Sequence, residues 1–290
     1  MQHKKQSCFE IIAVLMITSG VCVGGYPVIA TIYNDQRQAK AVAIQQDTVA
    51  EVDDDQKNEM LEDAQDYNER LNSLSVPLAQ YKEIDGYDSA LNVDGHGMMG
   101  YLTIPKILTI PKINVEIPIY HGTENSALGS GAGHLEGSSL PIGGKGNRPV
   151  LCSHRGIPGL RLFTDLDQLD IGDMFSVTVL GKTTEYQVCD VSVIEPDDYE
   201  SLKAHKDEDM VSLLTCTPYG INTQRLVVTG KRVIQNEDVI SGKVDNNHPI
   251  RNKVTENTCN TVSFVTIVVT LAIIVSVLIV VEAWIFFKKR

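Results

Sequence analysis

The sequence predicts a mainly β protein, in which a closed or nearly closed β-barrel follows an N-terminal helical segment and is flanked by two transmembrane helices. Three observations predict this fold. Short apolar and β-branched runs, separated by Gly- and Pro-containing turns, fill residues 99–236. A polar stretch without Gly or Pro precedes them. Two long uncharged segments lie near the ends of the chain.

The two uncharged segments run from Ile11 to Tyr33 and from Thr258 to Val281. At about 1.5 Å per residue, each is long enough to cross a hydrocarbon core of about 30 Å. We therefore expect transmembrane helices at residues 11–33 and 258–287. The first segment has an alternative interpretation as a cleaved signal peptide ending near Val28-Ile29-Ala30, because glycines and a proline interrupt it.

Basic residues at both ends of the chain predict its orientation in the cell membrane. Lys4 and Lys5 lie in a tail at residues 1–10, and a second basic tail occupies residues 288–290. Positively charged flanks stay in the cytoplasm. With both termini inside, everything between the two spans is predicted to be extracellular.

Residues 34–98 are predicted to form an extracellular helical segment. From Asp35 to Leu74, apolar residues recur at helical spacing and define a stripe that should pack on the barrel. The stripe consists of Met60, Ala64, Tyr67, Leu71 and Leu74. An acidic patch lies upstream of it, at Glu51 and residues 53–55. We interpret this patch as a solvated face or a break in the helix and not as a metal site.

The barrel domain, residues 99–236, contains seven runs with strand character, and residues 237–257 are the linker to the second span. The predicted strands are Gly100–Ile104, Val115–Tyr120, Val150–Ser153, Met174–Leu180, Thr183–Ile194, Met210–Thr215 and Arg225–Val233.

Composition excludes several classes of function. The net charge of −12 and the pI near 5.0 argue against a nucleic-acid partner, because phosphate binding requires a basic surface. No Cys and His residues have the spacing of a structural zinc site. We expect neither a metal nor a cofactor.

Three of the six cysteines, Cys152, Cys189 and Cys216, fall within the barrel domain. They are too few for a dense disulfide framework. Either Cys152 pairs with Cys189 and leaves Cys216 free, or all three are thiols. The sequence leaves both alternatives open.

Cys216 is the predicted nucleophile. It sits in a Pro- and Gly-punctuated turn after an apolar run, with Arg225 nine positions later. His154 is the predicted acid and base. Cys152 is the rival thiol, because it lies two residues before His154 and residues two apart on a strand share a face. We expect it to be a packed bystander. His121 and His134 are interpreted as turn or loop residues.

These motifs resemble those of the sortases, the cysteine transpeptidases on the surface of Gram-positive bacteria, and in particular those of the class C, pilus-polymerising branch. The matching segments are Leu213-Leu214-Thr215-Cys216 with Arg225, the longer stretch from Thr215 to Leu226, Gly133 to Pro141, Arg161 to Leu166, and Ile194 to Asp198. Dense similarity covers residues 99–233.

The resemblance implies an eight-stranded barrel and a reaction. Cys216 would attack an LPXTG-like sorting signal between Thr and Gly and form a thioacyl intermediate. His154 would protonate the departing amine, and Arg225 would hold the developing oxyanion. In class C the acceptor is a lysine amine of another pilin subunit, and the C-terminal span favours this branch.

Two alternatives to pilus assembly stay open at this point. One is a housekeeping sortase that anchors surface proteins to peptidoglycan. The other is a non-catalytic scaffold for pilus assembly, against which the intact Cys216, His154 and Arg225 argue.

The chain departs from the family pattern in two places. Many related sortases cover the cysteine with a lid bearing an Asp-Pro-aromatic tripeptide; the corresponding position here holds Val76-Pro77-Leu78, and Asp85-Gly86-Tyr87 lies closer to the barrel. Whether Val76, Pro77 and Leu78 act as a lid is left open. In addition, Leu102–Ile107 is repeated as Leu108–Ile113 where the family has one copy. We expect one copy to bulge or extend beyond the barrel.

Overall fold

The computed structural model of the protein describes residues 2–105 and 115–233. The predicted linker, C-terminal span and basic C-terminal tail, residues 237–290, lie outside the described residues. The chain divides into two compact units, of which the unit Asp35–Ile240 contains the barrel.

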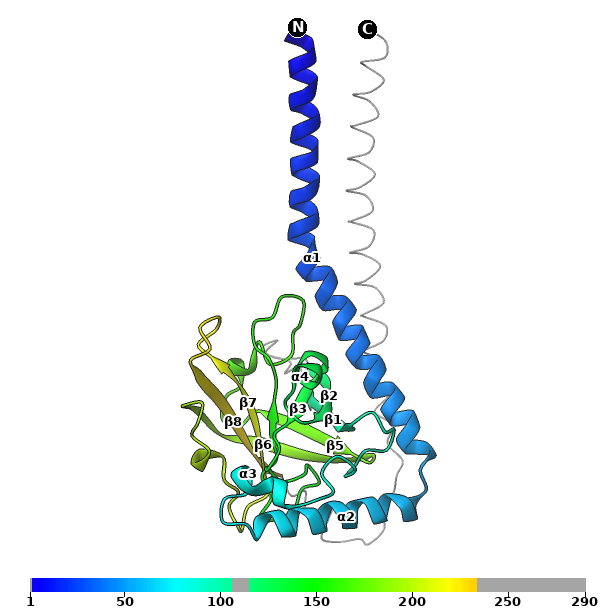
Figure 1. The fold of residues 1–290 in the computed structure, drawn as a ribbon, viewed down its shortest axis with the longest axis vertical. Helices are drawn as coiled ribbons and strands as arrows, with labels where there is room; N and C mark the ends of the chain where they lie inside the picture. The colour runs from blue at the N-terminus through cyan, green and yellow to red at the C-terminus, as the bar shows by residue number, and fades with distance from the viewer. Residues whose placement is uncertain (1, 106–114, 234–290) are drawn as a thin grey trace. The chain divides into compact units, whose positions relative to one another are not determined.

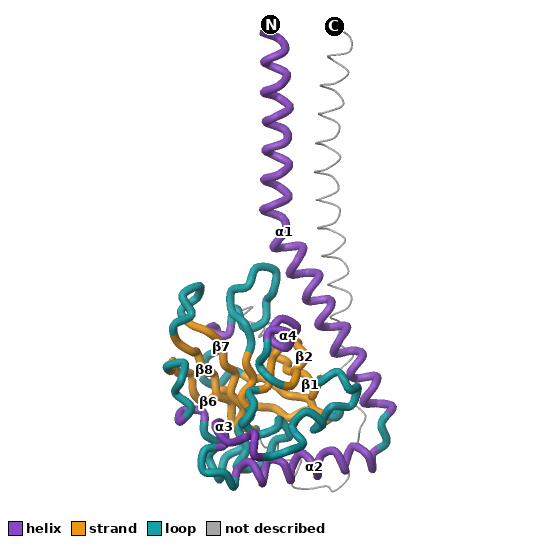
Figure 2. The backbone as a smooth tube through the Cα atoms, in the orientation of Figure 1, coloured by secondary structure: helices purple, strands orange, loops and turns teal. Residues whose placement is uncertain are grey.

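Eight strands form one closed barrel, which confirms the predicted fold class (Figures 1 and 2). In chain order the strands are β1 Met98–Ile104, β2 Val115–His121, β3 Ala132–His134, β4 Val150–Cys152, β5 Met174–Val179, β6 Lys182–Ile194, β7 Met210–Thr217 and β8 Gln224–Arg232. Around the barrel the order is β1-β2-β3-β4-β7-β8-β6-β5, and β5 pairs with β1 to close it. The pairs β2–β3 and β4–β7 are parallel.

Helices and short 3-10 turns occupy the remaining elements. The α-helices are α1 Gln2–Glu51, α2 Asp54–Asn72, α3 Pro77–Gln80 and α4 Asn125–Ser130; the 3-10 turns are η1 Tyr81–Glu83, η2 Leu166–Gln168 and η3 Glu200–Leu202. The N-terminal part of α1 is long and apolar enough to cross a membrane. A signal sequence has the same length and composition.

The amphipathic stripe packs against the barrel as predicted. Ala64, Tyr67 and Leu71 of α2 are buried in the main core, and the two outer members of the stripe pack against it. Asn68 on the same face exchanges two hydrogen bonds with the backbone of Leu140, its amide donating over 3.2 Å and its oxygen accepting over 2.6 Å. Figure 1 shows α2 lying across one end of the barrel.

The predicted helical stretch is two helices, with a break at the acidic patch. Asp53 caps α2, because its carboxylate accepts a hydrogen bond from the amide of Gln56 at 2.8 Å. Asp54 and Asp55 then occupy the first turn, where negative charge is favourable. The acidic residues therefore begin a helix, in agreement with the interpretation as a break.

The interpretation of His121 and His134 as turn or loop residues is wrong. His134 ends the short parallel strand β3 and is fully buried, while His121 ends β2. Burial lowers the pKa of His134 to about 4, so this ring is neutral. Its Nδ1 accepts from the hydroxyl of Tyr87 at 2.9 Å, and its Nε2 donates to the carbonyl of Ser139 at 2.8 Å.

The first copy of the repeat contributes to β1. Leu102, Thr103 and Ile104 pair with residues at the start of β2, and Pro105 follows the end of the strand. A proline at this point removes no ladder hydrogen bond. The second copy, at residues 108–113, lies outside the described residues, so the prediction that one copy bulges stays a prediction.

Candidate active site

The candidate site is built on the outer face of β4, β7 and β8. Side chains alternate along β7, so that Leu213 enters the main core and Leu214 faces outward. The register aligns Leu214 with Cys152 of β4 on one side and Val227 of β8 on the other. These positions belong to a second apolar cluster, the outer cluster: Val150, Cys152, Leu202 and Val227, with Leu78, Leu128, Leu135, Ile194 and Leu214 packed against it.

Beyond the outer cluster, alternation brings two predicted site residues to the same face. Cys216 lies two residues after Leu214 on β7 and is partly buried. It pairs directly with Arg225, which lies two residues before Val227 on β8. The Nη1 atom of Arg225 donates to the carbonyls of Asn222 at 3.2 Å and Gln224 at 3.0 Å. These bonds tie the guanidinium to the β7–β8 turn.

His154 reaches the level of Cys216 from the other side of β7. The chain leaving β4 stays beside β7, because the Ser153 amide donates to the carbonyl of Leu214 at 3.1 Å and Thr215 Oγ1 donates to the carbonyl of Ser153 at 2.8 Å. Continuing the parallel register of Cys152 with Leu214 by two residues places His154 opposite Cys216. The structure thus pairs Cys216 with Arg225, and the continued register is the basis for expecting His154 at the same level.

The three side chains are of the types that acyl transfer requires. A thiol, an imidazole and a permanently charged guanidinium supply a nucleophile, a proton carrier and an anion-binding group. In the described part of the chain, neither the Cys216 thiol nor the His154 imidazole hydrogen-bonds to another protein group. Neither group is thus held by a hydrogen bond to the described residues, and their catalytic roles stay a prediction.

The rival thiol Cys152 is buried in the outer cluster. Burial is the main cause that raises the pKa of Cys152 to about 12, and the nearby thiol of Cys216 raises it further. The charge of Arg225 opposes this shift. Cys152 is therefore a neutral thiol, poorly suited to nucleophilic attack. It is not paired with Cys189: all the cysteines among the residues described with side chains are free, which decides between the two alternatives left open by the sequence.

Arg148, which the sequence analysis did not single out, organises the opposite end of the same face. Its buried guanidinium donates to the hydroxyls of Ser212 at 2.9 Å and Thr229 at 3.1 Å, which join β7 and β8. It also donates to the carbonyls of Ser201 at 2.8 Å and Lys203 at 2.9 Å. Arg148 thus holds the β6–β7 loop against the barrel, and no sequence pattern signals this role.

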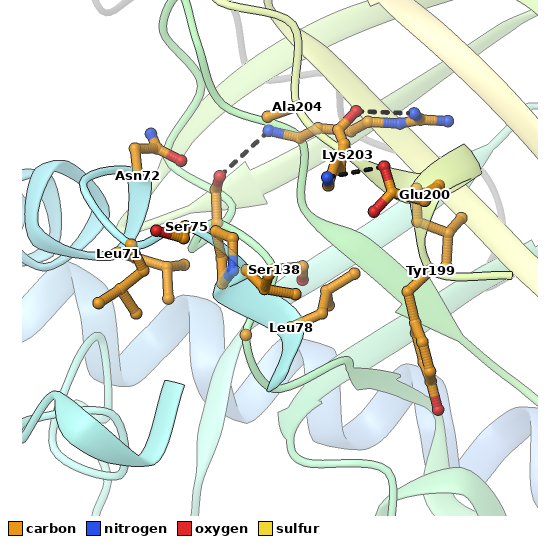
Figure 3. Close-up of a pocket in the computed structure, with 16 residues that line it drawn as sticks. Leu71, Asn72, Ser75, Leu78, Ser138, Tyr199, Glu200, Lys203 and Ala204 are labelled. Carbon is orange, nitrogen blue, oxygen red and sulfur yellow. Dashed lines mark hydrogen bonds and ion pairs between the residues drawn. The ribbon is translucent and has the colours of Figure 1, made fainter. Parts of the chain in front are cut away.

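A cavity of about 220 Å³ lies between the segment after α2 and the β6–β7 loop. Figure 3 shows Ser75 and Leu78 on one wall and Tyr199, Glu200 and Lys203 on the other. Lys203 forms an ion pair with Glu200 at 2.7 Å. The cavity is adjacent to the outer cluster, because Leu78 and Leu202 take part in both.

The lid candidates Val76, Pro77 and Leu78 lie at this cavity. Val76 precedes α3, Pro77 begins it, and Leu78 packs on the outer cluster. The backbone approaches Gly137 so closely that a Cβ there would stand 2.8 Å from the Cα of Leu78. Only glycine permits this approach, since the φ of Gly137 is also +83°. The segment therefore covers the apolar part of the face.

Asp85-Gly86-Tyr87, the other candidate for a lid motif, lies elsewhere. Tyr87 is buried in the main core, where its hydroxyl contacts His134 and accepts from the amide of Gly122 at 2.9 Å. This aromatic ring anchors the segment to β2 and β3. Among the described residues, no group of three or more His, Cys, Asp or Glu side chains is arranged to hold a metal ion.

Comparison with known proteins gives consistent results. The sequence model of the sortase domain family matches residues 108–233. Sortase D of Bacillus subtilis is 30% identical over 130 residues, which are 44% of this chain and 63% of that protein. The chain therefore spans less than two thirds of the length of this curated relative.

Solved structures are similar over their whole length. Sortase C1 of Streptococcus agalactiae is 40% identical with a TM-score of 0.59, and the match covers 68% of this chain and 100% of that one. Sortase C of Clostridium perfringens, solved with the C-terminal cell wall sorting motif, is 34% identical with a TM-score of 0.57. This match covers 68% of this chain and 100% of that one.

Proposed function

Because the chain belongs to the sortase family, whose members are cysteine transpeptidases, we propose that it cuts an LPXTG-like sorting signal between Thr and Gly and transfers the cut end to a pilin lysine. One observation supports the proposal: Cys216 of β7 pairs directly with Arg225 of β8, and the β4–β7 register, continued by two residues, puts His154 opposite Cys216. A scaffold without catalysis would not require this convergence.

In the first half of the proposed reaction, the sulfur of Cys216 attacks the carbonyl carbon of the signal's threonine. A carbon–sulfur bond forms, and the Thr–Gly amide bond breaks. His154 gives its proton to the departing amine. The guanidinium of Arg225 stabilises the negative charge on the carbonyl oxygen during the attack, since it is directly opposite the thiol.

In the second half, an ε-amine replaces the thiol. The lysine nitrogen attacks the thioester carbonyl and loses a proton to His154, and the carbon–sulfur bond breaks. The product is an isopeptide bond, and the thiolate of Cys216 is regenerated. Because His154 takes up in this step the proton that it gave in the first, each turnover is balanced.

Membership in the pilus-polymerising branch is supported by the class C structures that the chain resembles at 34–40% identity. A helix near the N-terminus that is long and apolar enough to cross a membrane supports attachment to the cell membrane. We propose a two-span arrangement with both termini in the cytoplasm and the barrel outside, as the basic tails predict.

We also propose that the segment Val76-Pro77-Leu78 is a lid. Leu78 occupies the outer cluster next to the reactive level, where the apolar residues of a sorting signal would bind. The tripeptide carries no carboxylate or aromatic ring, and Leu78 holds it to the barrel by apolar packing. It must move aside for a substrate to bind.

The test is to incubate membranes that contain the full-length chain with an LPXTG peptide and a pilin, and to identify the products by mass spectrometry. A covalent link between the signal's threonine and a pilin lysine is expected, with none from Cys216→Ala. Transfer to a peptidoglycan amine in place of lysine would identify an anchoring sortase. Pilin linkage that persists in Cys216→Ala would establish the scaffold.

A further inference from the structure

Arg155 forms an unusual bridge beside the candidate site. Its side chain is only 7% exposed and forms an ion pair with Asp167. Its Nε donates to the carbonyl of Thr164 at 3.2 Å, and its Nη1 donates to Thr217 Oγ1 at 3.2 Å. The ring of Tyr219 lies 5.8 Å from the guanidinium carbon.

These contacts join the two chain segments that carry the reacting groups. Arg155 follows His154 directly, and Thr217 follows Cys216 directly. A hydrogen bond between the two neighbours therefore fixes the distance between the histidine backbone and the cysteine backbone beyond the end of β4. Asp167 and Thr164 hold the guanidinium from the far side, so that it cannot turn away.

The bridge matters because the imidazole of His154 has no hydrogen-bond partner of its own in the described part of the chain. Its position depends on its backbone, which is held by the bond from the Phe163 amide to the His154 carbonyl at 3.1 Å and by the Arg155 bridge. An error of about 1 Å in such a placement can lower a rate about 100-fold.

We propose that Arg155 is a positioning residue, which holds His154 at the level of Cys216 through its hydrogen bond to Thr217. The inference rests on the proposed function, since it assigns Arg155 to the same transpeptidation. It adds a residue that contacts neither the sorting signal nor the reacting atoms.

Paired substitutions at Thr217 test the bridge in the full-length chain. Thr217→Val removes the acceptor oxygen and keeps the shape, whereas Thr217→Ser keeps the oxygen. We expect Thr217→Val to lower kcat about 10-fold with KM changed less than about twofold, because the reacting geometry and not substrate binding is lost. Thr217→Ser should retain the wild-type kcat. Equal kcat for both variants would overturn the proposal.

A double-mutant cycle tests whether the two residues act together. Arg155→Gln should lower kcat about 10- to 100-fold, and adding Thr217→Val should lower it no further. Independent, multiplicative losses would overturn the proposal. Arg161→Gln is the matched control. It removes a guanidinium from the same loop, but this guanidinium pairs with Asp35 at 3.7 Å and not with Thr217. If Arg155→Gln does not fold, the comparison of Thr217→Val with Thr217→Ser tests the proposal.

A second measurement needs no turnover, so that failure of the proposed function does not leave the bridge undecided. The thiol introduced by His154→Cys should form a disulfide with Cys216 under mild oxidation. Adding Thr217→Val should slow this reaction about 10-fold and Thr217→Ser should not. Equal rates of disulfide formation in the two Thr217 variants would overturn the positioning role. If these rates differ as expected but the wild-type chain has no transpeptidase activity, the proposed function is overturned and the bridge is established.

Discussion

Cys216 of β7 and Arg225 of β8 are directly opposed residues of one antiparallel ladder. Directly opposed side chains lie about 5 Å apart at Cβ, within reach of one bound carbonyl group. The alternation that puts Leu213 in the core puts both residues outside, so the fold itself determines that the thiol and the guanidinium share a face.

Removing the guanidinium should affect the chemical step. Arg225→Ala is expected to lower kcat about 100- to 1,000-fold in peptide cleavage, the range for loss of an oxyanion donor. Arg225→Lys should recover only part of this loss, because an ammonium lacks the planar fork. The melting temperature should change little, since the side chain is largely outside the core. Unchanged kcat in Arg225→Ala would remove this residue from the mechanism.

The proposed lid predicts a change in thiol accessibility. Leu78→Asp should release Val76-Pro77-Leu78 from the outer cluster and raise the alkylation rate of Cys216 several-fold, since the carboxylate is unfavourable there. Ile171→Asp is the control, because it makes the same change at a side chain that is 72% exposed. The rate is followed by mass spectrometry of the Cys216 peptide. Equal rates in wild type and Leu78→Asp would mean that this segment is no barrier to the thiol.

Cys152 should be chemically silent. Because its pKa is raised to about 12, alkylation near pH 8 should modify Cys216 and leave Cys152 unmodified in the folded protein. Peptide mapping before and after denaturation separates the two sites. Cys152→Ala should retain transpeptidation, and a loss of activity comparable with that of Cys216→Ala would contradict the assignment of the nucleophile.

Acid should destabilise the protein through His134. Its pKa is about 4 in the folded chain and 6.5 as an ordinary histidine, so between these values the unfolded chain binds the extra proton. The stability contributed by the neutral ring is complete above pH 6.5 and falls as the pH decreases to 4, by about 3 kcal/mol. Urea midpoints at pH 7.5 and 4.5 measure the fall. The difference should shrink in His134→Gln; an equal fall in both proteins would assign it to other groups.

Arg148 should contribute to folding. Arg148→Met leaves the carbonyls of Ser201 and Lys203 without their donor and is expected to cost about 2 kcal/mol of unfolding free energy. For a domain of this size the melting temperature should fall by about 4–8 °C. Lys231→Met, which removes an exposed cation paired with Glu208, should shift it by less than about 2 °C. Equal shifts would show that the buried network contributes no more than the surface pair.

Strong local patterns made most of the fold predictable. All seven predicted strands occur within two residues of their expected bounds. The eighth strand, β3, was expected only from the resemblance, because three residues that include Gly133 carry no alternation. His134 was misjudged for the same reason. Its burial depends on Tyr87, 47 residues away, whose hydroxyl satisfies the ring, and a sequence gives no sign of such a partner.

For the site, the sequence pointed to Cys216, His154 and Arg225, and the register explains why residues so far apart meet. The contacts of Arg155 and Arg148 could not be predicted, because most of their partners are loop carbonyls and hydroxyls contributed by distant segments. Backbone acceptors carry no residue identity, so a contact made mainly to them leaves no pattern in a sequence.

Closure of the barrel limits how the proposed sorting signal could bind. Every strand already has two neighbours, so in the described part of the chain no strand offers a whole open edge to a guest strand. Closure therefore restricts main-chain pairing with the sheet, a mode of peptide binding that is tolerant of sequence. Under the proposed function, individual side chains along the outer wall would then have to supply much of the selectivity for a short motif.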